Sequence, residues 1–372
     1  MKRRQFLATG SLALAGCKPA SREIDGGFTG VGFERGHRLR PASAGAPGAA
    51  QASPGEGLPT GSPGATRRVH TLIAGGGVAG LAAARALRQR GIDDFVVLEL
   101  EDSAGGNSRG GQVNGIACPL GAHYLPVPGD EAHEVQDLLE EFGLRRRLAG
   151  RWQYDERHLC HSPQERLFFN GEWQEGLLPV QGVGAATLGQ YRRFAERVRA
   201  AQLATPYAMP AFRAPASAAH LALNAIPFQA WLDREGLNDP HLRWYLDYCC
   251  RDDYGAAAGT VSAWAGLHYF ASRHGFHAPG DGEAEREGLF TWPEGNAWLA
   301  RRLIEPLGER LLTGRVALRV TEQRHGVDVL AWDVAGQRAE AWQAQTVVMA
   351  LPLFVAARIV EKVRVNPGNY AD

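Results

Sequence analysis

Three consecutive glycines, Gly75 to Gly77, separate two segments with different hydrophobic patterns. Residues 69 to 74 have the pattern of a buried strand, and residues 78 to 90 have that of a helix with small residues on its early turns. With Gly80, the glycines form the spacing Gly75-x-Gly77-x-x-Gly80. Between a strand and a helix, this spacing is typical of a turn that binds a dinucleotide.

Each position of this turn has a physical role. Gly75 permits the tight turn, Gly77 lets the backbone approach a pyrophosphate, and Gly80 allows close packing of helix on strand. The N–H groups of Val78 and Ala79 lie at the N-terminus of the predicted helix, where the partial positive charge attracts phosphate. The alternative, a glycine-rich turn that binds nothing, explains less of the surrounding sequence.

A second predicted strand, residues 95 to 99, supports the dinucleotide hypothesis. It ends in Glu99, where a carboxylate is expected to meet the ribose hydroxyls of the ligand. The strand, helix and strand together predict an α/β fold with a Rossmann-like binding domain.

The following residues, LELEDSAGGNSRGG at 98 to 111, are similar to the corresponding segment of FAD-dependent amine oxidases. The resemblance implies that Gly105 and Gly106 approach the phosphates and ribityl chain of FAD. An arginine usually follows the glycine pair in that family, whereas here Asn107 follows and Arg109 comes two positions later. Asn107 is therefore a candidate cofactor residue, and the individual roles of Asn107 and Arg109 stay open.

A further segment, Cys118 to Tyr124, follows a hairpin turn predicted at residues 113 to 116. It resembles the family segment that runs along the flavin ring, which makes Gly121, Ala122 and His123 candidate cofactor contacts. A dehydrogenase that uses only NAD has no need of this segment, so the resemblance favours FAD. A catalytic and a structural role for His123 are equally compatible with the sequence.

The resemblance returns in the last quarter of the chain. Glu294-Gly295-Asn296 is predicted to begin a helix that runs from 296 to about 311, followed by strands at 313–320, 327–333 and 337–343. Val316 matches the family position whose backbone contacts the adenine. Residues 345 to 352 resemble the strand and proline that lead back towards the FAD domain.

These observations predict an FAD-binding domain in two parts, residues 69–130 and 288–355, with a small β-sheet portion. Between them, residues 131–287 are predicted to form a largely helical substrate domain, with helices at 131–142, 187–203, 228–235 and 240–251. Its many aromatic residues form either a ligand wall or an ordinary core. Asp252 and Asp253 lie either beside a cavity or at a solvated helix end. The sequence has no convincing set of metal ligands, and it assigns no catalytic residue.

The first residues carry targeting signals. Residues 1–17 combine a pair of arginines, resembling a twin-arginine export signal, with a lipobox-like Leu14-Ala15-Gly16-Cys17. Cys17 is therefore a candidate lipidation site, and an ordinary cleaved signal is the alternative. Residues 18–68, rich in Pro, Gly, Ala and Ser, are expected to be a flexible linker, although 22–40 contain apolar residues able to pack on the body. We expect an exported, periplasmic or cell-surface protein attached to the membrane by lipid.

Composition limits the remaining partners. Lys and Arg together number 40, as do Asp and Glu, so no charge excess favours a nucleic acid. The resemblance implies a small-molecule substrate, by default an amine, that gives a hydride to flavin N5, with reoxidation by dioxygen or another acceptor. A desaturase or dehydrogenase of an apolar substrate is the enzymatic alternative.

Family members usually continue well beyond the segment matched at 345 to 352. Residues 356–372 are therefore expected to be a truncated C-terminus, with the whole chain a fragment of a flavin oxidase. A complete chain that binds its cofactor weakly or not at all is the other possibility. The missing C-terminal part favours a further hypothesis, a non-catalytic binding protein tethered to a surface.

Overall fold

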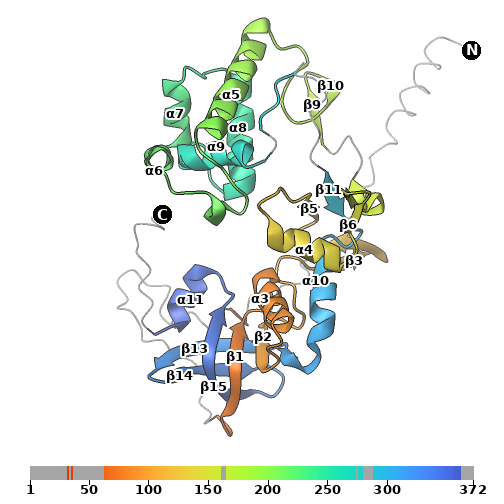
Figure 1. Ribbon diagram of the computed structural model, residues 1–372, viewed down its shortest axis with the longest axis vertical. Coiled ribbons are helices and arrows are strands. Elements are labelled where there is room, and N and C mark those ends of the chain that lie inside the picture. Colours follow the sequence, from red (N-terminus) through yellow and green to blue (C-terminus); the bar gives the residue numbers. More distant parts are fainter. Residues whose placement is uncertain are drawn as a thin grey trace, which may run out of the picture.

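The computed structural model describes residues 32, 35, 36, 63–160, 165–273, 275–279 and 288–361. The predicted signal with Cys17, most of the predicted linker and the residues after 361 lie outside these ranges. A group of helices, α5 to α9, occupies one end of the molecule and a six-stranded sheet the other, with α4 and several short strands between them (Figure 1). The α/β fold class is confirmed.

The six-stranded sheet has the order β12-β2-β1-β15-β14-β13. The strands are β12 Leu311–Leu312, β2 Phe95–Leu98, β1 Arg67–Ala74, β15 Arg338–Met349, β14 Gly326–Asp333 and β13 Arg315–Gln323. β1 is parallel to both of its neighbours, β2 and β15, whereas β15, β14 and β13 pair antiparallel. The strands expected at 337–343 and 345–350 are one continuous strand, β15, which borders the antiparallel and the parallel halves.

Alternating side chains of β1 and β2 cover two faces of this sheet. On one face Ile73 and Val97 pack with residues of α3 (Val78–Gln89) and α10 (Ala297–Ile304). On the other face Leu72 and Leu98 pack with β13, β14, β15 and α11 (Leu353–Ile359). Burial on both faces explains why β1 and β2 are apolar where they pair.

The helix predicted from 296 to about 311 is wrong in its second half. α10 ends at Ile304, and a 3-10 segment, η3 Glu305–Arg310, follows. Pro306 lacks the N–H needed to continue the α-helical ladder, and its ring is in steric conflict with the carbonyl one turn earlier. Gly308 then leaves the helical region altogether, with φ 52° and ψ −128°.

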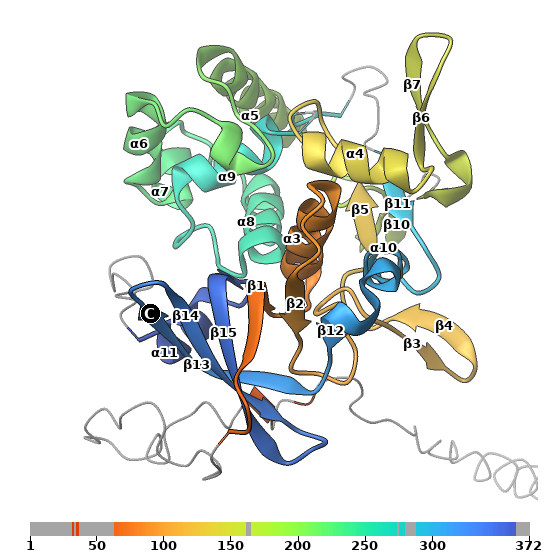
Figure 2. The same cartoon turned by 60° about the horizontal axis from the view of Figure 1, so that its bottom comes forward.

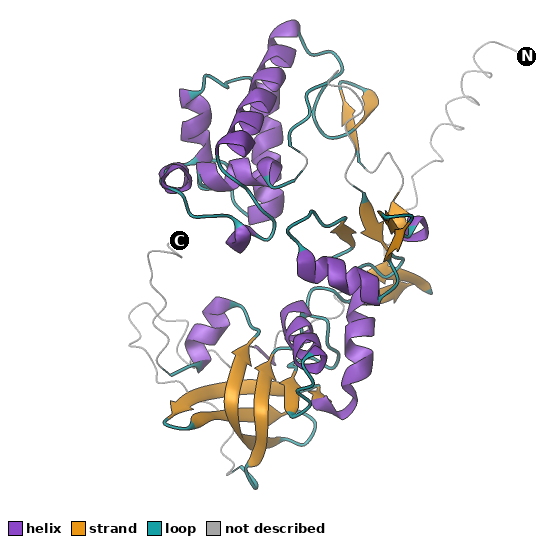
Figure 3. Cartoon of the chain, viewed as in Figure 1, coloured by secondary structure: helices purple, strands orange, loops and turns teal. Residues whose placement is uncertain are grey.

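The region predicted to form the substrate domain contains a helical bundle around one apolar core. Its helices are α5 Ala185–Ala204, α6 Ala218–Asn224, α7 Phe228–Arg234, α8 Pro240–Tyr254 and α9 Ala263–Ala271. Tyr191, Phe194 and Phe228 are fully buried in this core, and Tyr245, Tyr269 and Phe270 pack in it or against it, whereas Trp152, Phe168, Trp173, Trp244 and Tyr248 are exposed. Helices dominate this end of the molecule, as Figure 3 shows.

Short strands connect the bundle to the sheet. β5 Tyr124–Pro126, β11 Leu289–Thr291 and β8 Leu159–Cys160 form a three-stranded sheet beside α4 His133–Glu141. The predicted hairpin turn is present between β3 Gly110–Val113 and β4 Ile116–Pro119, with Asn114 and Gly115 both at positive φ.

Two further hairpins lie in the region expected to be mostly helical: β6 Arg145–Leu148 with β7 Arg151–Tyr154, and β9 Arg166–Phe169 with β10 Glu172–Glu175. Hairpins β3–β4 and β6–β7 extend outward from the body (Figure 2). Short 3-10 turns occur at η1 Glu156–His158 and η2 Ala211–Arg213. Within the described ranges, no helix is both long and apolar enough to cross a membrane.

Candidate cofactor site

The glycine turn between β1 and α3 is built as its spacing predicts. Gly75 adopts φ +105°, and its N–H donates to the Leu98 carbonyl at 2.8 Å. A Cβ at Gly80 would overlap the carbonyl oxygen of Gly75 and lie 3.3 Å from Ile73. Only glycine at position 80 therefore lets α3 approach β1 this closely.

Gly77 is different, because the space beside it is open. A Cβ built there would meet only the Cα of Gly106, at 3.7 Å. Gly77 precedes α3, whose first turn contains no acidic residue and has no side-chain cap. The exposed residues Val78 and Ala79 begin this turn, and the first N–H groups of a helix have no partner within it. The open space and these N–H groups suit an anion.

Glu99 follows β2 and turns its buried carboxylate towards the glycine turn. One oxygen accepts the N–H of Gly76 at 2.7 Å, and the other accepts the N–H of Glu101 at 2.8 Å. Burial raises the pKa of Glu99, and the two backbone donors oppose this shift. Each carboxylate oxygen keeps lone-pair capacity for a ribose hydroxyl.

The second glycine pair lies directly against the first glycine cluster. The N–H of Gly105 donates to the Gly76 carbonyl at 2.8 Å, and Gly105 forms a parallel bridge with Gly77. A Cβ at Gly106 would lie 3.0 Å from the Cα of Gly77. Segments far apart in sequence thus form one backbone surface without side chains.

Residues 121 to 124 extend this surface. The N–H of Ala122 donates to the Asn107 carbonyl at 2.7 Å, and a Cβ at Gly121 would lie 2.6 Å from Asn107 Oδ1. The His123 ring makes an edge-to-face contact with Tyr124, with centroids 4.9 Å apart. A catalytic role for His123 stays a prediction.

Asn296 fixes this segment from the opposite side, a role that the sequence did not indicate. Its N–H donates to the Ala122 carbonyl at 3.0 Å, and its side-chain Nδ2 donates to the Tyr124 carbonyl at 2.9 Å. Gly295 before it has φ +63°. The Glu294-Gly295-Asn296 sequence indicates a helix start, but it does not indicate that Asn296 also binds the backbone of residues 122 and 124.

Val316 lies near the same end of β2. Its side chain is buried in an apolar cluster with Leu318 and Trp332. The preceding residue, Arg315, donates its N–H to the Glu99 carbonyl at 2.8 Å. A backbone contact of Val316 with adenine stays a prediction.

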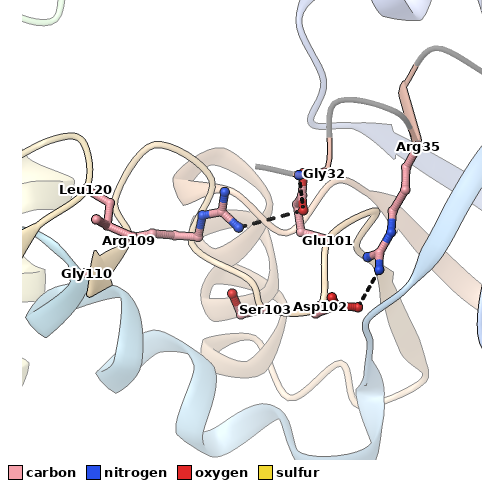
Figure 4. A pocket seen from close by; sticks show the side chains of 8 residues that line it. All are labelled: Gly32, Arg35, Glu101, Asp102, Ser103, Arg109, Gly110 and Leu120. Atoms are coloured by element: carbon pink, nitrogen blue, oxygen red, sulfur yellow. Dashed lines mark hydrogen bonds and ion pairs between the residues drawn. The ribbon is translucent and has the colours of Figure 1, made fainter. Parts of the chain in front are cut away.

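A cavity of about 440 Å³ lies beside the loop after Glu99. Figure 4 shows its lining: Gly32, Arg35, Glu101, Asp102, Ser103, Arg109, Gly110 and Leu120. Arg109 points to Glu101, with 3.9 Å between Nη1 and Oε2. Arg35 comes from the segment predicted to be a flexible linker, and nothing in its sequence context marked it.

The carboxylates at the end of α8 lie on the bundle side of Tyr124. Burial raises the pKa of Tyr124, and the charges of Asp252 and Asp253 add to the shift. Asp253 is paired with Arg273 at 3.1 Å. Both carboxylates are exposed at the helix end, which supports the solvated helix end of the two interpretations that the sequence left open. The described ranges contain no cluster of His, Cys, Asp and Glu able to hold a metal ion.

The assembled residues fit FAD. The open space at Gly77, the uncapped helix N-terminus, the side-chain-free glycine surface and the carboxylate of Glu99 suit a dinucleotide with a pyrophosphate. A Cβ at Gly77 would occupy the space that a phosphate needs.

Comparison with known proteins gives the same assignment. Residues 78–368 match the family model of flavin-containing amine oxidoreductases. A solved structure of putrescine oxidase bound to putrescine is 20% identical, with a TM-score of 0.61 over 82% of this chain and 63% of that one. Cyclohexylamine oxidase from Brevibacterium oxydans is 19% identical, with a TM-score of 0.51 over 80% of this chain and 61% of that one.

A curated relative matches a shorter stretch. A Baeyer-Villiger monooxygenase from Streptomyces coelicolor is 46% identical over 133 residues, which make up 32% of this chain and 25% of the relative. The chain thus spans less than two thirds of each of these three proteins.

Proposed function

The chain belongs to the flavin-containing amine oxidoreductases, and from this premise we propose that it oxidises a small-molecule amine with FAD. The backbone surface formed by Gly77, Gly105 and Gly106 carries the proposal, because it suits a pyrophosphate and little else. Bound FAD supplies a two-electron acceptor, which dioxygen or another acceptor reoxidises.

The chain's own residues contribute positioning. The hydrogen bonds from Ala122 and Asn296 hold residues 121–124 in one conformation against α10 and the loop at Asn107. We place the flavin ring along this segment, because residues 118–124 resemble the amine oxidase segment that runs along the flavin. A rigid segment beside the ring favours a single substrate orientation.

The surroundings of Tyr124 support a cationic substrate. Asp252 and Asp253 face this tyrosine closely enough to raise its pKa, and the exposed rings of Trp244 and Tyr248 stack on the same helix with centroids 6.1 Å apart. Carboxylates attract an ammonium group, and aromatic faces bind cations.

The visible absorption spectrum of the purified chain, dialysed free of excess FAD, tests the function. We expect flavin bands that bleach anaerobically when an amine is added and recover in air. Bands that ignore amines would indicate oxidation of another substrate class, such as the desaturation of an apolar compound. A chain that retains no flavin would contradict the proposal.

A variant pair tests the amine preference. Asp252→Asn should raise KM for the amine more than it lowers kcat, because the carboxylate binds the substrate charge without touching the reacting bond. Asp137→Asn, an exposed position on α4, is the control and should leave both constants unchanged. Equal kinetics for the two variants would argue against recognition at α8.

We also propose that the protein is exported and lipid-anchored at Cys17. The paired arginines and the lipobox-like residues before Cys17 support this location. In cells fed an alkyne analogue of palmitate, the wild-type protein should incorporate the label and fractionate with membranes. Cys17→Ala should do neither, and label retained in this variant would refute acylation at Cys17.

A further inference from the structure

Two residues far from the glycine turn in sequence contact the loop that leaves Glu99. The N–H of Gly32 donates to both carboxylate oxygens of Glu101, at 3.0 and 2.9 Å. The guanidinium of Arg35 donates to the Leu100 carbonyl at 3.0 Å and to Asp102 Oδ1 at 2.7 Å. Figure 4 draws the contacts of Gly32 with Glu101 and of Arg35 with Asp102, and it shows Arg35 in the wall of the cavity.

The side chain of Arg35 packs against this loop and is largely covered by it. Its side chain is 21% exposed, whereas that of its partner Asp102 is 85% exposed. The family match begins at residue 78, so Gly32 and Arg35 lie outside the segment that the family shares.

The loop concentrates negative charge at the site of a negatively charged ligand. Glu99, Glu101 and Asp102 contribute three carboxyl groups within four residues, and the pyrophosphate of FAD carries further negative charge. Like charges repel each other, and the repulsion is stronger where water is partly excluded. Arg35 and Arg109 are the cationic residues in the described lining of the cavity, paired with Asp102 and Glu101 respectively.

We propose that Arg35 is a cofactor-retaining residue. By neutralising Asp102 and holding the Leu100 carbonyl, it lowers the electrostatic repulsion between the loop and the pyrophosphate-bearing half of FAD. Arg35, which precedes strand β1 in the chain, thus contributes to FAD affinity. This inference rests on FAD binding and not on the identity of the substrate.

FAD binding to the apo form of the full chain, measured by quenching of flavin fluorescence, tests the proposal. Arg35→Ala should weaken FAD binding by about fivefold, because an ion pair with an exposed carboxylate contributes up to about 1 kcal/mol. Raising the ionic strength should narrow the difference, because salt screens the charges. Thermal unfolding of the apo forms shows whether the substitution acts through the fold.

The chain offers a matched control on the opposite end of β2. Arg310 donates to Asp93 Oδ1 at 2.8 Å and to the Asp93 carbonyl at 3.0 Å, with 34% of its side chain exposed. Arg310→Ala removes the same kind of contact before β2 begins, away from the glycine turn. It should leave FAD affinity at the wild-type value.

Removing the Asp102 charge as well separates neutralisation of this carboxylate from the other contacts of Arg35. In the double variant Arg35→Ala/Asp102→Asn, the unpaired carboxylate is gone, and we expect FAD affinity to return to within about 1.5-fold of wild type. A double variant as weak as Arg35→Ala would overturn the electrostatic role. Wild-type affinity in Arg35→Ala, or an equal loss in Arg310→Ala, would overturn the proposal. Neither outcome depends on amine oxidation, which the absorption experiment tests separately.

Discussion

Replacing Gly77 with alanine separates cofactor binding from folding. Gly77 has φ −71° and ψ −176°, which any residue can adopt, and its added Cβ would have only one neighbour, at 3.7 Å. At such a position, Gly→Ala stabilises a fold by about 0.4–1 kcal/mol through the unfolded chain. The apo protein should therefore melt at the wild-type temperature or slightly above it.

The same methyl group projects into the space proposed for the pyrophosphate. If it displaces one hydrogen bond between a helix N–H and phosphate, the loss is about 1.5–3 kcal/mol. This corresponds to an FAD dissociation constant roughly 10- to 150-fold higher. Gly77→Val should abolish retention of FAD through dialysis, because its larger side chain leaves no room for adjustment.

Gly80→Ala is the comparison variant, because its Cβ would overlap the Gly75 carbonyl. Overpacking of this kind costs about 1–3 kcal/mol of folding free energy, so the apo protein should melt at a lower temperature. Fluorescence titration with FAD and thermal unfolding of the apo forms measure both quantities. Wild-type FAD affinity in Gly77→Ala, or an apo melting temperature as low as that of Gly80→Ala, would refute the placement of the phosphates.

Further predictions concern the helical bundle. Burial lowers the pKa of His268 below 6.5, so its stabilising contribution is complete above pH 6.5 and is lost as pH falls through the lowered pKa; urea titrations between pH 7 and 5 should show a shallower loss for His268→Gln. Gly189→Ala inside α5 should stabilise by about 0.5–1 kcal/mol, whereas Gly255→Ala, at φ +64° after α8, should destabilise by about 1–2 kcal/mol. Opposite shifts in melting temperature would check this pair. Asp239 caps α8 and accepts the Thr187 hydroxyl at 2.7 Å, so Asp239→Ala should cost about 1–2 kcal/mol and Asp239→Asn much less in the same urea titrations.

The sequence predicted those parts of the site whose signals are local. Gly75, Gly77 and Gly80 each meet a backbone or packing requirement within one strand–turn–helix unit, and Glu99 directly follows the next strand. The C-terminal end of α10 also has a local signal, because Pro306 cannot continue an α-helix. The apolar periodicity continues past Pro306, and a helix predicted from periodicity alone is therefore too long.

Other features carry no local signal. The turn of hairpin β6–β7 places Ala149 at φ 48°, a conformation that alanine disfavours, so no Asn-Gly or Asp-Gly pattern marks it. The pairing of Arg35 with Asp102 joins two polar residues from distant segments. Charge pairs have no periodicity, and only the folded chain brings them together.

The position of β15 has a consequence for the order in which the protein can assemble. β1 is a central strand, and its second neighbour, β15, spans Arg338–Met349, more than 260 residues later in the chain. A nascent chain emerging from the ribosome can pair β1 with β2 early, but one edge of β1 then stays unpaired until residues 338–349 have been synthesised. Gly75 also packs against Ala350 just beyond β15, so the turn that holds the cofactor reaches its final form only after translation has passed this strand. Binding of FAD to the finished turn therefore follows the pairing of β1 with β15, because this long-range pairing must form first.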